Sequence, residues 1–350
     1  MAEERQGRQK REDKDPGCTA PAGRGCKANS HATSVALARA TAPHKGHIGG
    51  DLRGTSTLAA QSQAWRRGMR QLKNRTAILT GASRGLGTYI ARALAGEGVN
   101  LVLAARSAGE LERVAEEMRA LGVRAIAVPG DVTVAEDRQR LVEATLAEFG
   151  RIDILVNNAG IEVTAHFERQ PEEELRATID VNLTSALLLT RQVIPVMLER
   201  KAGHIVNMAS LAGKVPVPFS VPYAASKAGL VGLTESLRGE FRSRGVSASV
   251  VCPGLVSEAG MYVQMQQDAG VKENFLAGTV TPKKVASDVV KAIKRDRPEM
   301  LVYRGPGRLV SAFAEAAPGA FERVFPIFGT GTLFRKIADA REKQRDQGGT

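Results

Sequence analysis

The chain has 350 residues, 43% of them hydrophobic, so it can form one large packed domain with extensions or two small domains. Its formal net charge is +12, but residues 1–74 contain 14 Lys and Arg against 6 Asp and Glu and therefore carry +8 of it. Only +4 remains for residues 75–350, so we expect no nucleic-acid partner.

Residues 1–64 are rich in Gly, Ala, Ser, Thr and Arg and contain few large apolar residues. A segment of this composition cannot bury enough apolar surface to fold, so we predict a disordered basic tail. Its cysteines and histidines do not match the spacing of a structural zinc site, and no metal ion is expected. The alternative that the biological start lies at Met69 stays open.

Between residues 65 and 304 short apolar runs alternate with amphipathic stretches. Runs such as L-V-L-A-A at 101–105 are apolar throughout, which is typical of strands covered on both faces of a parallel sheet. Strands are predicted at 76–80, 100–105, 125–129, 152–157, 204–209, 247–252 and 300–303, and helices at 85–97, 108–121, 135–149, 171–200, 223–244 and 282–295. The pattern predicts an α/β domain at 65–304, with a doubly wound Rossmann-type fold whose seven-stranded parallel sheet is flanked by helices.

The first predicted strand runs directly into T-G-A-S-R-G-L-G at 80–87, which opens the first helix. Glycines are needed in such a turn because the backbone must approach a pyrophosphate closely, and the helix N-terminus then stabilises the phosphate charge. We therefore predict a dinucleotide site that includes Gly81, Ser83, Gly85, Leu86 and Gly87.

Two arginines indicate which dinucleotide binds. Arg84 lies in the glycine loop, and Arg106 follows the second strand, where a carboxylate for a free ribose diol would stand. Guanidinium groups attract a 2′-phosphate, so we predict NADP(H) rather than NAD(H). The alternative is that both arginines are solvated surface residues.

The sequence Y-A-A-S-K places Tyr223 and Lys227 four residues apart, thirteen and seventeen residues after Ser210. Four residues are about one helical turn, so the phenol and the ammonium share a face, and the cation is predicted to lower the pKa of the phenol. A tyrosine tuned in this way exchanges a proton near neutral pH, which is carbonyl-reductase chemistry.

Together these motifs resemble the short-chain dehydrogenase/reductase family, over about Asn74 to Tyr303. The motifs that carry the resemblance are the glycines at 81, 85 and 87, N-N-A-G at 157–160, Asn182 in D-V-N-L, Ser210, Y-A-A-S-K and C-P-G at 252–254. The resemblance implies that Tyr223 protonates the carbonyl oxygen, Ser210 orients it, Lys227 contacts the nicotinamide ribose, and Asn182 holds a water that relays protons to Lys227. For Asn182 the alternative is a polar residue inside a helix.

The resemblance also implies cofactor contacts beyond the glycine loop. These are Asp131, Val132, Asn157, Ala159, Gly160, Tyr223, Lys227, Pro253, Gly254 and Val256. N-N-A-G has a structural alternative, because asparagine side chains also tie strands and turns together. One departure is Glu258, where the family commonly has a threonine. We expect this carboxylate to point away from the pyrophosphate, with Ser257 as the nearest substitute hydroxyl.

Residues 211–222 are mostly apolar, and Met261, Tyr262, Met265 and Phe275 continue this character in 256–278, which favours a hydrophobic substrate. Residues 305–350 are predicted to form an amphipathic helical extension, in which five of the ten phenylalanines fall between 309 and 337. This extension packs on the domain or a neighbouring subunit, contacts a membrane surface peripherally, or acts as a mobile lid; all three alternatives stay open.

Cys18, Cys26 and Cys252 are an odd set that implies no disulfide framework, so we expect a reducing, cytoplasmic location. No apolar run reaches the roughly 18 residues of a membrane-spanning helix. The predicted function is an NADPH-dependent oxidoreductase, a homo-oligomer acting on an apolar ketone, aldehyde or acyl-type substrate. A non-catalytic NADP(H)-binding regulator and a membrane-attached scaffold are the alternatives.

Overall fold

The computed structural model describes residues 69–270, 278–305, 307–324 and 330–348. The tail predicted at 1–64 lies outside the described residues, as do Phe325 and Phe328 of the extension.

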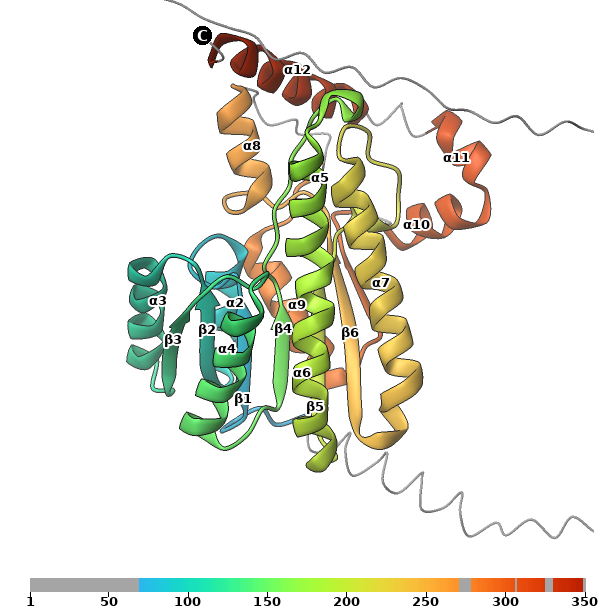
Figure 1. Ribbon diagram of the computed structural model, residues 1–350. Coiled ribbons are helices and arrows are strands. Elements are labelled where there is room, and N and C mark those ends of the chain that lie inside the picture. The colour runs from blue at the N-terminus through green and yellow to red at the C-terminus, as the bar shows by residue number, and fades with distance from the viewer. Residues whose placement is uncertain (1–68, 271–277, 306, 325–329, 349–350) are drawn as a thin grey trace, which may run out of the picture. The chain divides into compact units, whose positions relative to one another are not determined.

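The described residues contain one sheet of seven parallel strands, as predicted (Figure 1). Its spatial order is β3-β2-β1-β4-β5-β6-β7, so the order reverses between β1 and β4. A doubly wound sheet binds its ligands at this reversal, beyond the carboxyl ends of the strands. The strands are β1 (Thr76–Thr80), β2 (Asn100–Ala105), β3 (Ala125–Pro129), β4 (Ile154–Asn157), β5 (Gly203–Met208), β6 (Val246–Pro253) and β7 (Glu299–Val302).

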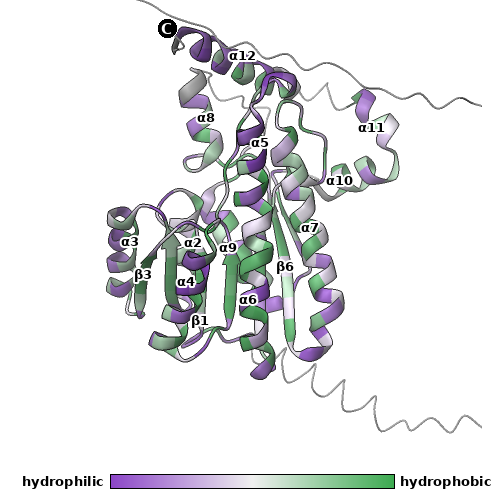
Figure 2. Cartoon of the chain, viewed as in Figure 1, coloured by the Kyte–Doolittle hydropathy of each residue, from purple (hydrophilic) through white to green (hydrophobic). Residues whose placement is uncertain are grey.

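Helices cover both faces of the sheet because side chains alternate along each strand. In β1, Ala77 and Leu79 face the core under α2 (Leu86–Gly96), α3 (Ala108–Ala120) and α9 (Pro282–Arg295). Ile78 faces the opposite core, under α4 (Ala135–Phe149) and α6 (Ser185–Glu199). Figure 2 shows the strands as a hydrophobic layer between these helices.

The helix predicted at 171–200 is interrupted. It consists of α5 (Glu172–Ile179), a π-helical turn at Asp180–Thr184 and α6, because an extra residue is accommodated where Asn182 turns inward. The whole stretch Glu172–Glu199 is long and apolar enough to cross a membrane. Its apolar side packs on the sheet through residues such as Leu189 and Val193, as in the core helix of a globular domain.

The extension contains α10 (Gly307–Ala316), α11 (Pro318–Val324) and α12 (Thr330–Gly348). On α12, Leu333 and Ile337 are buried against Tyr262 of α8 (Met261–Ala269), a helix that the sequence pattern did not predict. Asp339 of α12 also lies 2.8 Å from His166 Nε2. This helix therefore packs on the α/β domain, at the end of the sheet where the strands have their carboxyl ends (Figure 1).

Candidate active site

A continuous cavity of about 1780 Å³ runs along the carboxyl ends of the strands. One end lies at the glycine loop and the ends of β2 and β3, and the other lies under α8, α10 and α12. The cavity is larger than a typical pocket for one drug-sized ligand, which is roughly 300–1,000 Å³. It therefore has room for a dinucleotide and a second molecule side by side.

The glycine loop leaves no space for a side chain at Gly81 or Gly87. Gly81 has φ +64°, and a Cβ there would lie 2.9 Å from Ala159 Cα. A Cβ on Gly87 would lie 2.1 Å from Gly81 O. The hydroxyl of Thr80 accepts hydrogen bonds from Asn158 N and Ala159 N, both at 3.0 Å, and so joins the ends of β1 and β4.

The same loop fits a diphosphate. Helix α2 begins after Gly85, and no side chain of the described residues caps its first N–H groups. These donors and the positive end of the helix dipole face the cavity, which is the arrangement that binds phosphate. The residues present therefore fit a dinucleotide cofactor.

Arg84 and Arg106 both line this end of the cavity and are exposed. Arg106 Nη1 lies 3.9 Å from Asp131 Oδ2, which is a loose ion pair between partly solvated groups. Both guanidinium groups can thus turn toward an anion at the end of β2. Asp131 and Val132 line the cavity beside them.

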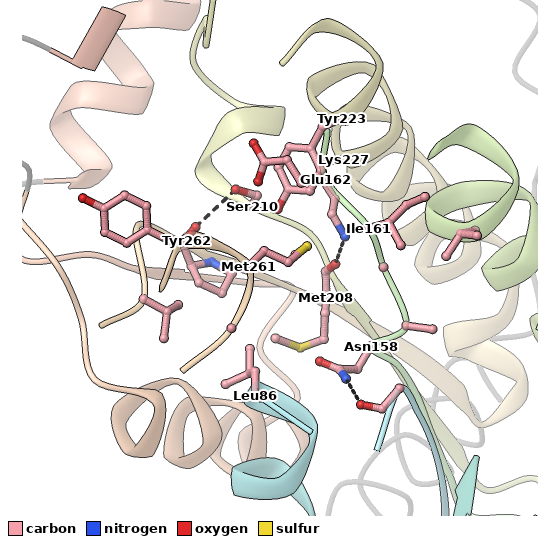
Figure 3. A pocket seen from close by; sticks show the side chains of 18 of the residues that line it. Leu86, Asn158, Ile161, Glu162, Met208, Ser210, Tyr223, Lys227, Met261 and Tyr262 are labelled. Carbon is pink, nitrogen blue, oxygen red and sulfur yellow. Dashed lines mark hydrogen bonds between the residues drawn. The ribbon is translucent and has the colours of Figure 1, made fainter. Parts of the chain in front are cut away.

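Ser210, Tyr223 and Lys227 meet where the two ends of the cavity join (Figure 3). Ser210 follows β5, and its Oγ accepts a hydrogen bond from Ala212 N at 3.1 Å. Tyr223 and Lys227 lie near the start of α7 (Val221–Phe241) and are 6% and 3% exposed. Lys227 Nζ donates to Met208 O at 2.9 Å and lies 5.4 Å from the centre of the Tyr223 ring.

Burial governs the proton affinities of this group. It raises the pKa of Tyr223, the nearby Glu162 carboxyl raises it further, and a hydrogen bond with Ser210 acts in the opposite direction. Burial also lowers the pKa of Lys227 to about 8, against the opposing effect of Glu162. Burial is the largest influence on the pKa of Tyr223, and the effect of Lys227 on the phenol stays a prediction.

Asn182 lies behind the cavity rather than in its wall. From the π-helical turn its Oδ1 accepts a hydrogen bond from Ile161 N at 2.8 Å, and its Nδ2 donates to Ile161 O at 2.9 Å and to Ser226 Oγ at 3.0 Å. It therefore holds the loop after β4 in place beside α7. Its role in relaying protons through water stays a prediction.

The structure places the Asn157 side chain away from the predicted cofactor site. Its side chain points into the core, where Nδ2 donates to Asn207 Oδ1 at 2.8 Å and to Thr190 Oγ1 at 3.1 Å, and it does not line the cavity. The structural alternative for this asparagine therefore agrees with the geometry. Its neighbour Asn158, which was missed, lines the cavity and donates to Thr80 O and Gly81 O at 3.0 and 3.1 Å.

The remaining predicted residues all line the cavity. They are Gly81, Ser83, Arg84, Gly85, Leu86, Gly87, Arg106, Asp131, Val132, Ala159, Gly160, Ser210, Tyr223, Lys227, Pro253, Gly254 and Val256. The hydroxyl of Ser257 donates to Val280 O at 3.3 Å, and Ser257 does not line the cavity, so its role as a substitute for the threonine stays a prediction. Glu258 is exposed at the cavity rim, with a left-handed φ of 64°.

Sequence reasoning also missed Glu162, the second residue after N-N-A-G. Its carboxyl lies in the cavity beside Tyr223 and Ser210 (Figure 3). Burial raises its pKa to about 7, while a hydrogen bond from Ser220 and the charge of Lys227 act to lower it. The only available signal was its position, since an acidic residue shortly after the end of β4 falls at the ligand edge of the sheet.

The sheet order, the glycine loop and the Ser210–Tyr223–Lys227 group define an oxidoreductase of CH–OH and C=O groups. The family profile described as short chain dehydrogenase matches residues 75–270, more than half of the chain. The chain therefore belongs to the short-chain dehydrogenase/reductase family.

Similar proteins agree with this assignment. Ketoacyl reductase HetN from Nostoc sp. is 43% identical over 280 residues, which cover 79% of this chain and 96% of that protein. A 3-oxoacyl-[acyl-carrier-protein] reductase from Synechocystis sp. is 41% identical over 190 residues, covering 54% of this chain and 77% of the relative.

Two solved structures share the fold. A metagenomic short-chain oxidoreductase in complex with NADP has a TM-score of 0.57 and 35% identity, covering 66% of this chain and 98% of its own. A single-substitution variant of actinorhodin polyketide ketoreductase with NADPH has a TM-score of 0.60 and 31% identity, covering 67% of this chain and 97% of its own.

Substituting Asn157 by Ala should destabilise the protein while leaving dinucleotide affinity nearly unchanged. The change leaves the buried Oδ1 of Asn207 without the donor that Asn157 provides, which costs about 1–3 kcal/mol. Urea unfolding measures the loss, and fluorescence titration with NADPH measures affinity. An unchanged midpoint together with weaker NADPH binding would restore Asn157 to the cofactor site.

Proposed function

We propose that this protein is an NADPH-dependent carbonyl reductase whose substrate is an apolar, acyl-type ketone. The observation that carries the proposal is the position of Ser210, Tyr223 and Lys227. These residues meet between the end of the cavity at the glycine loop and its apolar end under α8, α10 and α12, which we call the chamber. A non-catalytic NADP(H)-binding regulator has no need of a buried proton donor at that junction. The reducing cytoplasm and a homo-oligomeric state remain part of the proposal.

The preference for NADP(H) is supported from two sides. Arg84 and Arg106 place two exposed cations at the end of β2, a strand that ends without a carboxylate for a ribose diol. The two structural neighbours hold NADP and NADPH. A 2′-phosphate would bind both guanidinium groups through charge-assisted hydrogen bonds.

The substrate class follows from the walls of the chamber. Val215, Val217, Met261, Met265 and Phe334 line it, and methionine side chains adapt to flexible alkyl chains. The relatives are named ketoacyl and 3-oxoacyl reductases, which are enzymes of acyl chains. We therefore place an acyl chain in the chamber, with its ketone at Ser210 and Tyr223.

The cofactor supplies a hydride when bound, and the protein supplies the rest of the chemistry. Ser210 and Tyr223 hydrogen-bond the ketone oxygen, where negative charge develops. Tyr223 keeps its proton at neutral pH because burial raises its pKa, so it is ready to donate that proton to the new alkoxide. Lys227 lies against the Tyr223 ring and stabilises the phenolate that remains.

A substrate screen tests the proposed function directly. NADPH oxidation would be followed with 3-oxoacyl thioesters, medium- and long-chain ketones, and aldehydes, with NADH as the comparison. We expect the highest kcat/KM with an acyl-chain ketone and NADPH. Tight binding of NADPH with no turnover of any carbonyl compound would favour the regulator instead.

Substituting Tyr223 by Phe should lower kcat by about 100-fold or more, because the proton donor is lost while the buried ring remains. Steady-state kinetics on a substrate from the screen measures the effect, and NADPH titration and thermal melting serve as controls. Near-normal turnover in this variant would contradict the proposed mechanism.

The double change Arg84→Ala and Arg106→Asp should shift preference from NADPH toward NADH. Two cations are lost and a carboxylate for the ribose diol is gained, and each charged hydrogen bond contributes about 1.5–3 kcal/mol. The ratio of kcat/KM for the two cofactors reports the shift. If that ratio stays at the wild-type value, the arginines are surface residues without a cofactor role.

Phe334 and Phe313 form a matched pair for testing the extension. Phe334 is 5% exposed and lines the chamber, whereas Phe313 is 40% exposed and lies outside it. Phe334→Ala should raise KM for an acyl-chain ketone about 10-fold, since burial of such a side chain is worth roughly 1.5–3 kcal/mol. Phe313→Ala should leave KM unchanged, and equal effects in both variants would remove α12 from the substrate site.

A further inference from the structure

The carboxyl of Glu162 lies at the catalytic end of a chamber that is otherwise mainly apolar (Figure 3). An acidic group in such a place costs free energy unless its charge or its proton is used. The reductase function proposed above gives Ser210, Tyr223 and Lys227 their roles, but assigns none to Glu162.

The backbone and one neighbouring hydroxyl hold this carboxyl in place. Asn182 binds both the N–H and the C=O of Ile161, the residue before Glu162. Ser220 is fully buried, and its Oγ donates to Glu162 Oε1 at 2.9 Å. Although Ser220 lies at the N-cap of α7, its hydroxyl is turned to Glu162 and not to the helix. The bonds of Asn182 to the Ile161 backbone and of Ser220 to the carboxyl together hold the Glu162 side chain in the cavity.

Two titratable side chains interact electrostatically with Glu162. Tyr223 and Lys227 face it from α7, and their pKa values respond to its charge. Tyr262 of α8 lines the same chamber, and Cys252 of β6 lies behind the Tyr223–Lys227 pair. Among these groups, a carboxyl is the strongest acid and the readiest to release a proton.

Each reduction leaves Tyr223 without a proton. The ketone carbon accepts the hydride, its oxygen takes the Tyr223 proton, and the tyrosine remains as a phenolate. Because Tyr223 is 6% exposed, the phenolate is poorly hydrated and must regain a proton before the next turnover.

We propose that Glu162 is the proton reservoir of this active site and returns a proton to Tyr223 after each reduction. In this step the O–H bond of the Glu162 carboxylic acid breaks, and its proton passes through a cavity water to the Tyr223 phenolate. The phenol is restored and Glu162 becomes a carboxylate, which then takes up one proton from the bulk solvent. The sum is one ketone, one NADPH and one proton converted to one alcohol and one NADP⁺.

The direction of transfer follows from proton affinity. The pKa of Glu162 is raised to about 7, whereas that of Tyr223 is raised from an already higher value, so the proton moves downhill to the phenolate. Glu162 carries the proton below about pH 7 and loses it as pH rises through that value. Its negative charge also raises the pKa of Tyr223, so the tyrosine becomes a weaker proton donor at higher pH.

Rapid-mixing kinetics with Glu162→Gln separate proton return from hydride transfer. Glutamine keeps the shape of the side chain and can still accept the Ser220 hydrogen bond, but it cannot supply a proton. We expect the first NADPH per active site to be oxidised within about 2-fold of the wild-type rate, and later turnovers to be about 10-fold slower or more. Imidazole added as a small diffusing acid should restore part of the later rate.

Two comparisons complete the design. Wild-type kcat should fall as pH rises from 6 to 8 through the carboxyl's titration near 7, and the Glu162→Gln profile should lose this step. Glu148→Gln removes an exposed carboxylate that pairs with Arg124, and neither residue lines the cavity, so the kinetics of this variant should match the wild type. NADPH affinity and melting temperature are measured for every variant.

The outcomes are distinct. Equal first and later rates in Glu162→Gln and the wild type would overturn the reservoir, as would a wild-type kcat that is flat over this pH range. A loss of the first turnover, or of NADPH binding, would show a structural role and would also overturn it. A wild-type protein that reduces no carbonyl compound would instead refute the proposed function, and the reservoir with it.

Discussion

The cost of burying charged groups governs the active site of this protein. Tyr223, Lys227 and Glu162 share the cavity, and burial moves the pKa of each in the direction that favours its neutral form. As a result, the phenol of Tyr223 keeps its proton, the pKa of the Lys227 ammonium falls to about 8, and the pKa of the Glu162 carboxyl rises to about 7. The same desolvation that makes these groups costly to bury gives each of them a proton affinity useful for reduction.

The chain keeps these groups in place through polar ties at the carboxyl edge of the sheet. Thr80 joins the ends of β1 and β4, Asn157 joins β4 to β5 and α6, and Asn182 fixes the loop that carries Glu162. The last tie requires the π-helical turn, which directs Asn182 away from the regular helix surface. Buried hydrogen bonds of this kind are expensive to break, so they hold the site rigidly.

The C-terminal extension completes the substrate side. Leu333 and Ile337 of α12 pack on Tyr262, and Phe334 reaches the chamber itself. Ion pairs of α12 with the domain, such as Arg341 with Glu174 at 2.8 Å, lie at its solvent-accessible side and contribute less than this apolar contact. The extension thus adds to the chamber a wall that the doubly wound sheet does not provide.

The amino-acid sequence by itself determined the seven strands, their parallel arrangement, the glycine loop and the Ser210–Tyr223–Lys227 group. These features are encoded locally, because an apolar run specifies a strand covered on both faces, and a helical repeat places two side chains on one face. Only the tertiary structure decided that Asn157 points into the core, that Asn182 lies in a π-helical turn, that α12 covers the chamber and that burial raises the pKa of Tyr223. The importance of Glu162 emerged in the same way, because burial and electrostatic coupling depend on residues far apart in the chain, and no local pattern records which of them will meet.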